Sequence, residues 1–216
     1  MKLKLLVGAV AVLGVLVIWR FIRTEAPPID QLDARMEKLR ADGDVEALDA
    51  EAQSQDVPTA RRAVESMGYV GPKAVRHIRR ALDDPRPAIR QQAATAYARA
   101  ADPKDTAPLT KVARTDKSPV VRAAAVTALG QARVYEGMET LLEAMNDDDI
   151  VVRRRAAEAV ILFTGRRYPY RADAPSAQRL KSIAVIRKFW ARAKDIASRY
   201  YDKERRRRKE AAEKSR

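Results

Sequence analysis

The stretch SPVVRAAAVTALG, residues 118–130, decides the fold of this chain. It opens with a proline at its second position, continues as an alanine-rich helical pattern and has a single arginine in its first turn. Related stretches occur 32 residues earlier, as RPAIRQQAATAYA (residues 86–98), and 31 residues later, as DIVVRRRAAEAVI (residues 149–161). A fixed period of about 30 residues indicates stacked supersecondary units.

An arginine and an acid recur at fixed places in these copies. The arginines are Arg90, Arg122 and Arg153, and an acid precedes each by six residues: Asp84, Asp116 and Asp147. A fourth, degenerate copy, PTARRAVESMG (residues 58–68), has Ala60 in place of the arginine. The helical spacing puts Arg122 at the edge of a buried stripe, where a guanidinium needs a fixed acceptor. We therefore interpret these arginines as structural rather than catalytic.

Shorter apolar patterns lie between the alanine-rich stretches, in residues 71–82, 105–113 and 136–145. Their large apolar residues are three or four positions apart, which is the spacing of one helix face and not of a strand. Glycines and prolines separate them from the longer helices. The sequence thus predicts an all-α fold made of about four helix–turn–helix pairs.

These repeated residues resemble HEAT repeats, in particular the short bacterial repeats related to the phycobilisome-lyase HEAT-like repeats. The resemblance covers about residues 44–164 and implies an α-solenoid. In that family the recurrent acid and arginine form a ladder that ties each repeat to the next. Carried over by position, the resemblance implies that Asp84 bonds Arg90, Asp116 bonds Arg122 and Asp147 bonds Arg153, or that these residues bond the backbone of neighbouring turns.

The composition offers few groups for catalysis. The chain has no cysteine and one histidine, which excludes a thiol nucleophile, a cysteine-based metal site and a histidine relay. We interpret that histidine, His77, as an ordinary helix residue. The acidic stretch NDDDI (residues 146–150) lacks the glycine and terminal glutamate of an EF-hand loop, so turns and helix caps are the better interpretation. We expect no enzyme activity, no cofactor and no metal.

The N-terminal segment, residues 1–23, contains an unbroken apolar run over residues 5–19. A helix over residues 3–22 could span a bilayer at about 1.5 Å per residue. The segment predicts a single transmembrane signal-anchor, and the bulky residues after the run disfavour the rival, a cleaved signal peptide. We expect a single-pass protein of the inner membrane. The positive charges that flank the apolar run favour a cytoplasmic N-terminus, and hence a periplasmic solenoid, by about one charge. Residues 24–43 are expected to form a linker and an N-terminal capping helix.

The net charge of +14 is concentrated at one end of the chain. Residues 1–150 have 22 basic and 22 acidic side chains, whereas residues 151–216 have 21 and 7. The last segment, residues 202–216, is a polybasic tail that includes Arg205, Arg206, Arg207, Arg208 and Lys209. Anionic lipid is the first candidate for what this tail binds, nucleic acid the second and acidic protein the third. A merely solvated run of charge is the remaining alternative.

Residues 165–201 are predicted to form an aromatic loop and a C-terminal capping helix. The helix begins near Ser176, a suitable N-cap residue. Ile183, Ile186 and Trp190 follow at helical spacing and give it one apolar face. An open-ended solenoid needs such a terminal cap. A long basic C-terminal helix is therefore expected to close the fold.

The function predicted from these features is that of a non-catalytic, membrane-anchored scaffold or assembly protein. It would bind another, unidentified protein through the solenoid surface. The candidate partner-binding residues are small, neutral positions of the middle repeats that are expected to face solvent: Gln91, Thr95, Ala123 and Thr127. The outer repeats have Arg61 with Glu65 and Arg154 with Glu158 at the same positions, where i,i+4 ion pairs are expected.

Two alternatives belong to other functional classes. A nucleic-acid-binding HEAT-like protein of the DNA glycosylase type would need basic and aromatic residues along its groove. The middle repeats have Gln91, Gln92, Ala123 and Ala124 instead, so nucleic acid is not the expected partner. A chromophore-lyase-like chaperone is the other alternative, and it follows only from the resemblance of the repeats.

Overall fold

The computed structural model describes residues 29–133 and 135–214, except for the side chains of residues 29, 30, 194–201, 204, 205 and 208–214. The chain divides into two compact units, residues 1–35 and 36–216. Its elements in chain order are α2 (Ile29–Asp42), α3 (Val45–Ala52), α4 (Val57–Val70), η1 (Pro72–Ala74), α5 (Val75–Ala81), α6 (Pro87–Ala100), α7 (Ala107–Thr115), α8 (Pro119–Ala132), η2 (Tyr135–Gly137), α9 (Met138–Ala144), α10 (Ile150–Thr164) and α11 (Ser176–Lys214).

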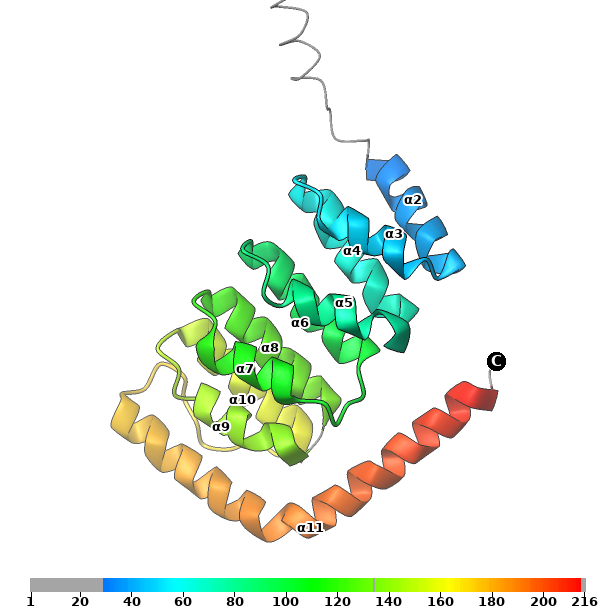
Figure 1. The fold of residues 1–216 in the computed structure, drawn as a ribbon. Helices are drawn as coiled ribbons and strands as arrows, with labels where there is room; N and C mark the ends of the chain where they lie inside the picture. The colour runs from blue at the N-terminus through cyan, green and yellow to red at the C-terminus, as the bar shows by residue number, and fades with distance from the viewer. Residues whose placement is uncertain (1–28, 134, 215–216) are drawn as a thin grey trace, which may run out of the picture. The chain divides into compact units, whose positions relative to one another are not determined.

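Four helix pairs stack in order within the second unit: α3/α4, α5/α6, α7/α8 and α9/α10 (Figure 1). The longer second helices form one layer, in which α4 packs on α6, α6 on α8 and α8 on α10. The shorter first helices form the other layer. No strand occurs in the described part of the chain. The prediction of an all-helical solenoid built from repeated helix pairs is confirmed.

Glycine and alanine allow the second helices to approach one another closely. A Cβ atom added to Gly130 of α8 would lie 2.6 Å from the Cβ of Ala159 on α10. A Cβ added to Gly68 of α4 would lie 3.0 Å from the Cβ of Ala96 on α6. These two glycines occupy the same position of the repeat. The alanine-rich composition of the opening stretch is therefore a packing requirement of adjacent repeats.

Helix starts follow from prolines and acids at the expected places. Pro87 and Pro119 occupy the first position of α6 and α8, where a missing N–H costs nothing. Asp56 accepts a hydrogen bond from the Thr59 N–H at 2.9 Å and caps α4. Asp149 accepts one from the Val151 N–H at 2.7 Å and caps α10.

The first half of α11 covers the last repeat. Ile183, Ile186 and Trp190 are buried. The Trp190 ring stacks on Tyr135 with centroids 5.3 Å apart and meets Phe163 edge-on at 4.9 Å. The helix then continues to Lys214, so the segments assigned separately to a cap and a polybasic tail belong to one helix.

The prediction of a membrane-anchored fold is corrected. Across residues 29–133 and 135–214, no helix is long and apolar enough to cross a bilayer. The paired helices have 7 to 15 residues, whereas a span needs about 20 apolar ones, and α11 is rich in charged residues. The segment 1–23, on which the prediction of a single-pass inner-membrane protein rested, lies outside the described residues, as does the linker up to residue 28. The prediction of an inner-membrane localisation is therefore withdrawn as well.

Candidate functional site

The recurrent arginines link each repeat to the next one. Arg122 of α8 donates from Nε and Nη2 to the two carboxylate oxygens of Asp147, at 2.9 and 2.8 Å. Its Nη1 donates to the Asp116 carbonyl at 2.9 Å. The side chains of Arg122 and Asp147 are only 15% and 13% exposed. One guanidinium thus binds the turn of its own repeat and the acid of the following repeat.

Arg90 makes the equivalent link one repeat earlier. Its Nε and Nη2 donate to the carboxylate of Asp116 at 2.7 and 2.9 Å, and its Nη1 donates to the carbonyls of Asp84 and Pro85. Burial opposes ionisation of Asp116, but hydrogen bonds from Arg90 and the Ser118 N–H outweigh it and lower the pKa of this carboxyl. We call these two links, Arg90–Asp116 and Arg122–Asp147, the ladder.

At each end of the ladder, the terminal residue has a partner of a different kind. Arg153 donates to the Ala172 carbonyl at 2.7 Å and to the carbonyls of Asp147 and Asp148, so backbone of the C-terminal loop takes the place of a further acid. Asp84 pairs with Arg86 of its own repeat rather than with Arg90.

Arg86 is a linking residue that the repeat pattern does not identify. It reaches back to the first helix pair, where Nη1 donates to the Ser54 carbonyl at 2.5 Å and Nη2 to the Ala52 carbonyl at 3.1 Å. The ladder position of that first pair is occupied by Ala60, which has no donor. Hydrogen bonding from Arg86 also lowers the pKa of the Asp84 carboxyl, against the opposing effect of burial. The sequence contained one indication of this role. Because Ala60 stands where the other repeats have an arginine, the first junction needs a hydrogen-bond donor from elsewhere in the chain.

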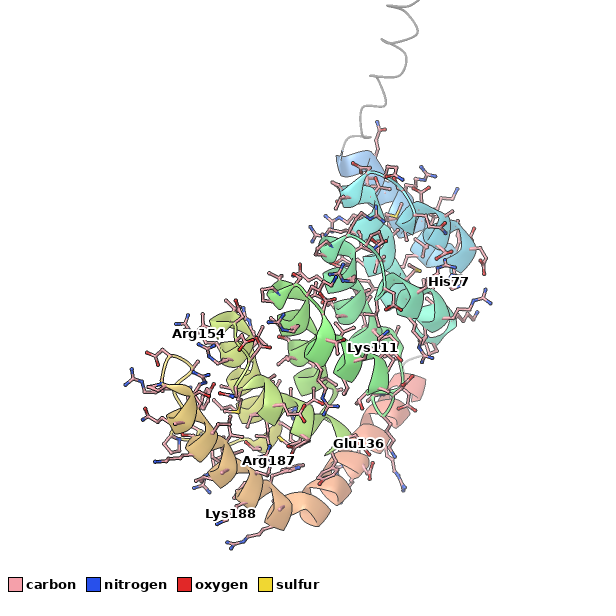
Figure 2. The ribbon with its side chains drawn as sticks, turned by 60° about the vertical axis from the view of Figure 1, so that its left-hand side comes forward. His77, Lys111, Glu136, Arg154, Arg187 and Lys188 are labelled. Atoms are coloured by element: carbon pink, nitrogen blue, oxygen red, sulfur yellow. The ribbon has the colours of Figure 1, made fainter. Side chains whose placement is uncertain are left out.

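His77 belongs to a cluster of charged residues between α3 and α5 (Figure 2). It is buried, and its Nδ1 lies 3.1 Å from Oδ1 of Asp49. Arg76 donates from Nε to its Nε2 at 2.7 Å, which assigns the proton of a neutral ring to Nδ1. Arg80 also binds the Asp49 carboxylate. Burial raises the pKa of Asp49, but the hydrogen bond from Arg80 and the adjacent His77 ring outweigh it, and the pKa is lowered overall.

The four candidate partner-binding residues do not share one exposed surface. Gln91 and Thr95 of α6 are exposed. Ala123 of α8 is 6% exposed, so the prediction that it faces solvent is wrong. Val126 and Gly130, three and seven residues further on, lie on the same side of α8 and are also buried. Gly130 approaches Ala159 of α10, so this side of α8 faces the next repeat. Thr127 is half-buried, and its hydroxyl donates to the Ala123 carbonyl at 2.9 Å.

The ion pairs expected on the outer repeats have a different spacing. Glu65 pairs with Arg62 at 3.1 Å, and Glu158 pairs with Arg155 at 2.9 Å. Both are i,i+3 pairs, whereas Arg61 and Arg154 were the expected partners. The charge of these two acids is balanced on their own helices.

A groove runs between α5 and α7 on the layer of first helices. Two adjoining cavities, of about 650 and 350 Å³, share four lining residues: Leu82, Asp83, Lys111 and Val112. Leu82 and Val112 are buried and form an apolar floor, whereas Lys111 is exposed at the rim and pairs with Asp83 at 3.2 Å (Figure 2). The larger cavity reaches the ladder at Arg90 and Asp116.

The polybasic segment continues α11. Arg206 and Arg207 are exposed, whereas the side chains of Arg205, Arg208 and Lys209 lie outside the described residues. No group of three or more His, Cys, Asp or Glu residues suited to a metal ion occurs among the side chains that the structure describes.

Comparison with known proteins agrees with the architecture. A family model for HEAT repeats matches residues 45–130 and 106–214. No curated protein matches the chain. Similar solved structures include the complex of CpcE and CpcF of phycocyanin lyase from Nostoc sp. PCC7120, with 24% identity, a TM-score of 0.49 and coverage of 65% of this chain and 88% of that chain. Because the family model matches more than half of its residues, this chain belongs to the HEAT-repeat family.

Proposed function

We propose that this chain is a non-catalytic scaffold that binds another protein through the surface of its solenoid. The observation on which the proposal rests is the groove between α5 and α7, whose floor is apolar and whose rim is charged. Sites that bind a partner commonly combine an apolar centre with a polar rim. Lys111 and Asp83 form part of that rim, and Leu82 and Val112 form the floor.

An extended segment of the partner suits this groove. The two cavities adjoin and together cross the junction between the second and third helix pairs. Pro85, Pro87 and Pro108 line them and contribute no backbone N–H donor. Recognition would therefore rest on apolar contact with the floor and on charged groups of the rim.

The hydrogen bonds made by the buried carboxylates support a role without catalysis. The carboxylates of Asp49, Asp116 and Asp147 each accept hydrogen bonds from an arginine of a neighbouring helix pair. A general acid or base must reach a proton of the substrate, whereas these groups are engaged in joining the repeats.

Two matched variants test the proposal. Thr115 of α7 lines the groove, and Thr95 of α6 belongs to the other layer. Both side chains are exposed, and each hydroxyl donates to the carbonyl four residues earlier. We expect Thr115→Arg to reduce recovery of the partner at least about tenfold by obstructing the groove, and Thr95→Arg to leave it unchanged. Recovery is measured by affinity purification of the full chain with quantitative mass spectrometry.

The opposite result, in which only Thr95→Arg loses the partner, would place the binding surface on the layer of second helices and refute the groove. Melting temperatures of both variants should stay close to that of the wild type, which excludes unfolding as the cause. If neither Thr115→Arg nor Thr95→Arg changes the recovery of any protein, the proposed scaffold function is contradicted.

A second candidate is a chaperone of the chromophore-lyase type, for which the support is the resemblance of the repeats to phycobilisome-lyase HEAT-like repeats. The two candidates differ in one simple property. A chromophore-handling protein should co-purify with a coloured partner, which a visible absorbance spectrum of the purified complex detects. A partner without visible absorbance favours the general scaffold.

A further inference from the structure

His77 is the only histidine of the chain, and its side chain is only 6% exposed. It lies on α5, where this helix faces α3 of the first pair (Figure 2). Histidine is the side chain that normally gains a proton between about pH 8 and pH 5, and cysteine, which can also titrate in this range, is absent from the sequence. A proton added to a side chain in mild acid is therefore expected at His77.

Both nitrogens of the His77 ring have fixed neighbours. Nε2 accepts a hydrogen bond from Nε of Arg76 at 2.7 Å. Nδ1 lies 3.1 Å from Oδ1 of Asp49, although the geometry is not that of a hydrogen bond. An arginine only donates, so Nε2 is without a proton and the neutral ring has its proton on Nδ1. Arg76 thus holds the ring in its neutral form.

Glu46 of α3 is a second neighbour of Nε2. Its Oε1 lies 3.6 Å from Nε2 and accepts a hydrogen bond from Nη2 of Arg76 at 2.5 Å. The side chains of Arg76 and Glu46 are 75% and 72% exposed, and an ion pair so exposed is easily rearranged. A carboxylate suited to a protonated ring therefore lies next to the nitrogen that Arg76 occupies.

We propose that His77 is a proton-responsive switch at the junction of the first two helix pairs. When Nε2 takes a proton from solvent, both ring nitrogens become donors, so the hydrogen bond from Arg76 breaks. Nε2 then donates to Oε1 of Glu46, and the guanidinium of Arg76 moves into solvent. The link between α3 and α5 passes from the Arg76–Glu46 pair to a His77–Glu46 pair, in which both groups are again charged.

The remaining charges of α3 and α5 favour this exchange. Asp49 is next to Nδ1, and Arg80 binds Oδ2 of the same carboxylate. Before the exchange, the carboxylates of Glu46 and Asp49 are balanced by the guanidiniums of Arg76 and Arg80. Departure of Arg76 leaves two carboxylates and one guanidinium beside the ring, which stabilises its positive charge.

The other elements packed on α5 are α4, α6 and η1. Their carboxylates, among the described residues, are all beyond ion-pair distance of the ring. Arg62 and Glu65 of α4 pair with each other. The hydroxyl of Tyr97 on α6 donates to Asp105, and Lys73 of η1 is exposed. The response of His77 to acid is therefore governed by the charged side chains of α3 and α5, and it is independent of the α5/α7 groove.

The position of the ring proton gives the first test. Because the chain has one histidine, a long-range proton–nitrogen correlation spectrum of the isotopically labelled full chain contains one ring. We expect the Nδ1–H form at about pH 8. Arg76→Met should shift the ring toward the Nε2–H form, since Glu46 can then accept from Nε2. Arg114→Met, which removes another exposed arginine paired with an acid, should leave the ring unchanged. An Nε2–H ring in the wild type would overturn the proposal.

Titration of the same sample from about pH 8 to about pH 5 tests the exchange itself. We expect the Nε–H signal of Arg76 to change with the same midpoint as the ring signals. Glu46→Gln should lower the titration midpoint of the ring by about 0.5 pH unit. Glu143→Gln, the matched control on α9, should shift it by less than about 0.1 pH unit, and circular dichroism verifies that the variants are folded.

Two outcomes of the titration would contradict the switch. One is a ring that becomes protonated while the Arg76 signal stays the same, because Arg76 would then not be displaced. The other is a ring that is still neutral at about pH 5. Equal midpoints for the wild type and Glu46→Gln would exclude Glu46 as the new partner and overturn the exchange as well.

Discussion

Arg122 and Asp147 are 25 residues apart in the sequence and are joined by two parallel hydrogen bonds between the third and fourth helix pairs. The guanidinium also holds the turn that precedes its own helix. A bidentate pair of this kind fixes both the distance and the angle between its partners. The same geometry at Arg90 and Asp116 makes the stacking of the middle repeats regular.

Substitution of Gly130 tests the close approach of the second helices. In Gly130→Ala the new Cβ would lie 2.6 Å from the Cβ of Ala159, so α8 and α10 must move apart. We expect a loss of about 1–3 kcal/mol in unfolding free energy from this overpacking. Gly137→Ala is the matched control, since its Cβ meets Leu129 at an ordinary 3.6 Å. Urea denaturation measures both, and equal stability of the two variants would contradict the packing.

Removal of the Arg86 side chain should loosen the first junction selectively. Arg86→Ala leaves the carbonyls of Ala52 and Ser54 without their donor, at a cost of about 1–3 kcal/mol. We expect faster amide hydrogen exchange in α3 and α4 and little change in α8 and α10. Lys73→Ala, at an exposed position, serves as the control. Uniform acceleration along the chain would show that Arg86 has no local role.

Acid should weaken the junctions between helix pairs. The pKa values of Asp49, Asp84 and Asp116 are lowered in the folded chain, and an unfolded aspartate titrates near about 3.9. Their contribution is fully present above the unfolded pKa and is lost as the pH falls through the lower folded pKa. We expect constant stability near neutral pH and a steep loss below about pH 4.

Asp116→Asn should reduce this acid dependence, since it removes one of the three carboxylates. Asp83→Asn, at an exposed side chain, should reproduce the wild-type profile. The measurement is the unfolding free energy from urea titrations at a series of pH values. A wild-type profile that stays flat down to about pH 2.5 would refute the linkage.

The aromatic contact of α11 with the last repeat should be worth several kilocalories per mole. Trp190 packs against Tyr135 and Phe163 and is buried. We expect Trp190→Ala to lower the unfolding free energy by about 3–5 kcal/mol and Lys188→Ala, on the exposed side, to leave it unchanged. If both variants denature at the same urea concentration as the wild type, α11 does not cap the solenoid.

Periodicity was sufficient to predict the repeats, because helix pairs with a fixed spacing bury the same positions each time. The spacing of Arg90 and Arg122 identified residues at the junctions. The pairing of each arginine with the carboxylate six residues before it was wrong, because the choice between that acid and the acid of the next repeat depends on how two pairs are stacked. The structure joins Arg90 to Asp116 and leaves Asp84 to Arg86.

Features that depend on neighbouring helices could not be predicted from the pattern of one helix alone. Ala123 is buried because its side of α8, which it shares with Val126 and Gly130, faces α10 of the next repeat. The α5/α7 groove arises only where two non-consecutive helices meet, and Arg86 follows no repeat.

The most direct test of the account is a double-mutant cycle on Arg122 and Asp147. The unfolding free energies of the wild type, Arg122→Ala, Asp147→Ala and the double variant give the coupling between the two side chains, which we expect to be about 2 kcal/mol. The same cycle on the exposed pair Arg114 and Glu143 should give at most about 0.5 kcal/mol. A coupling for Arg122 and Asp147 no larger than that of the exposed pair would contradict the claim that the ladder holds the repeats together.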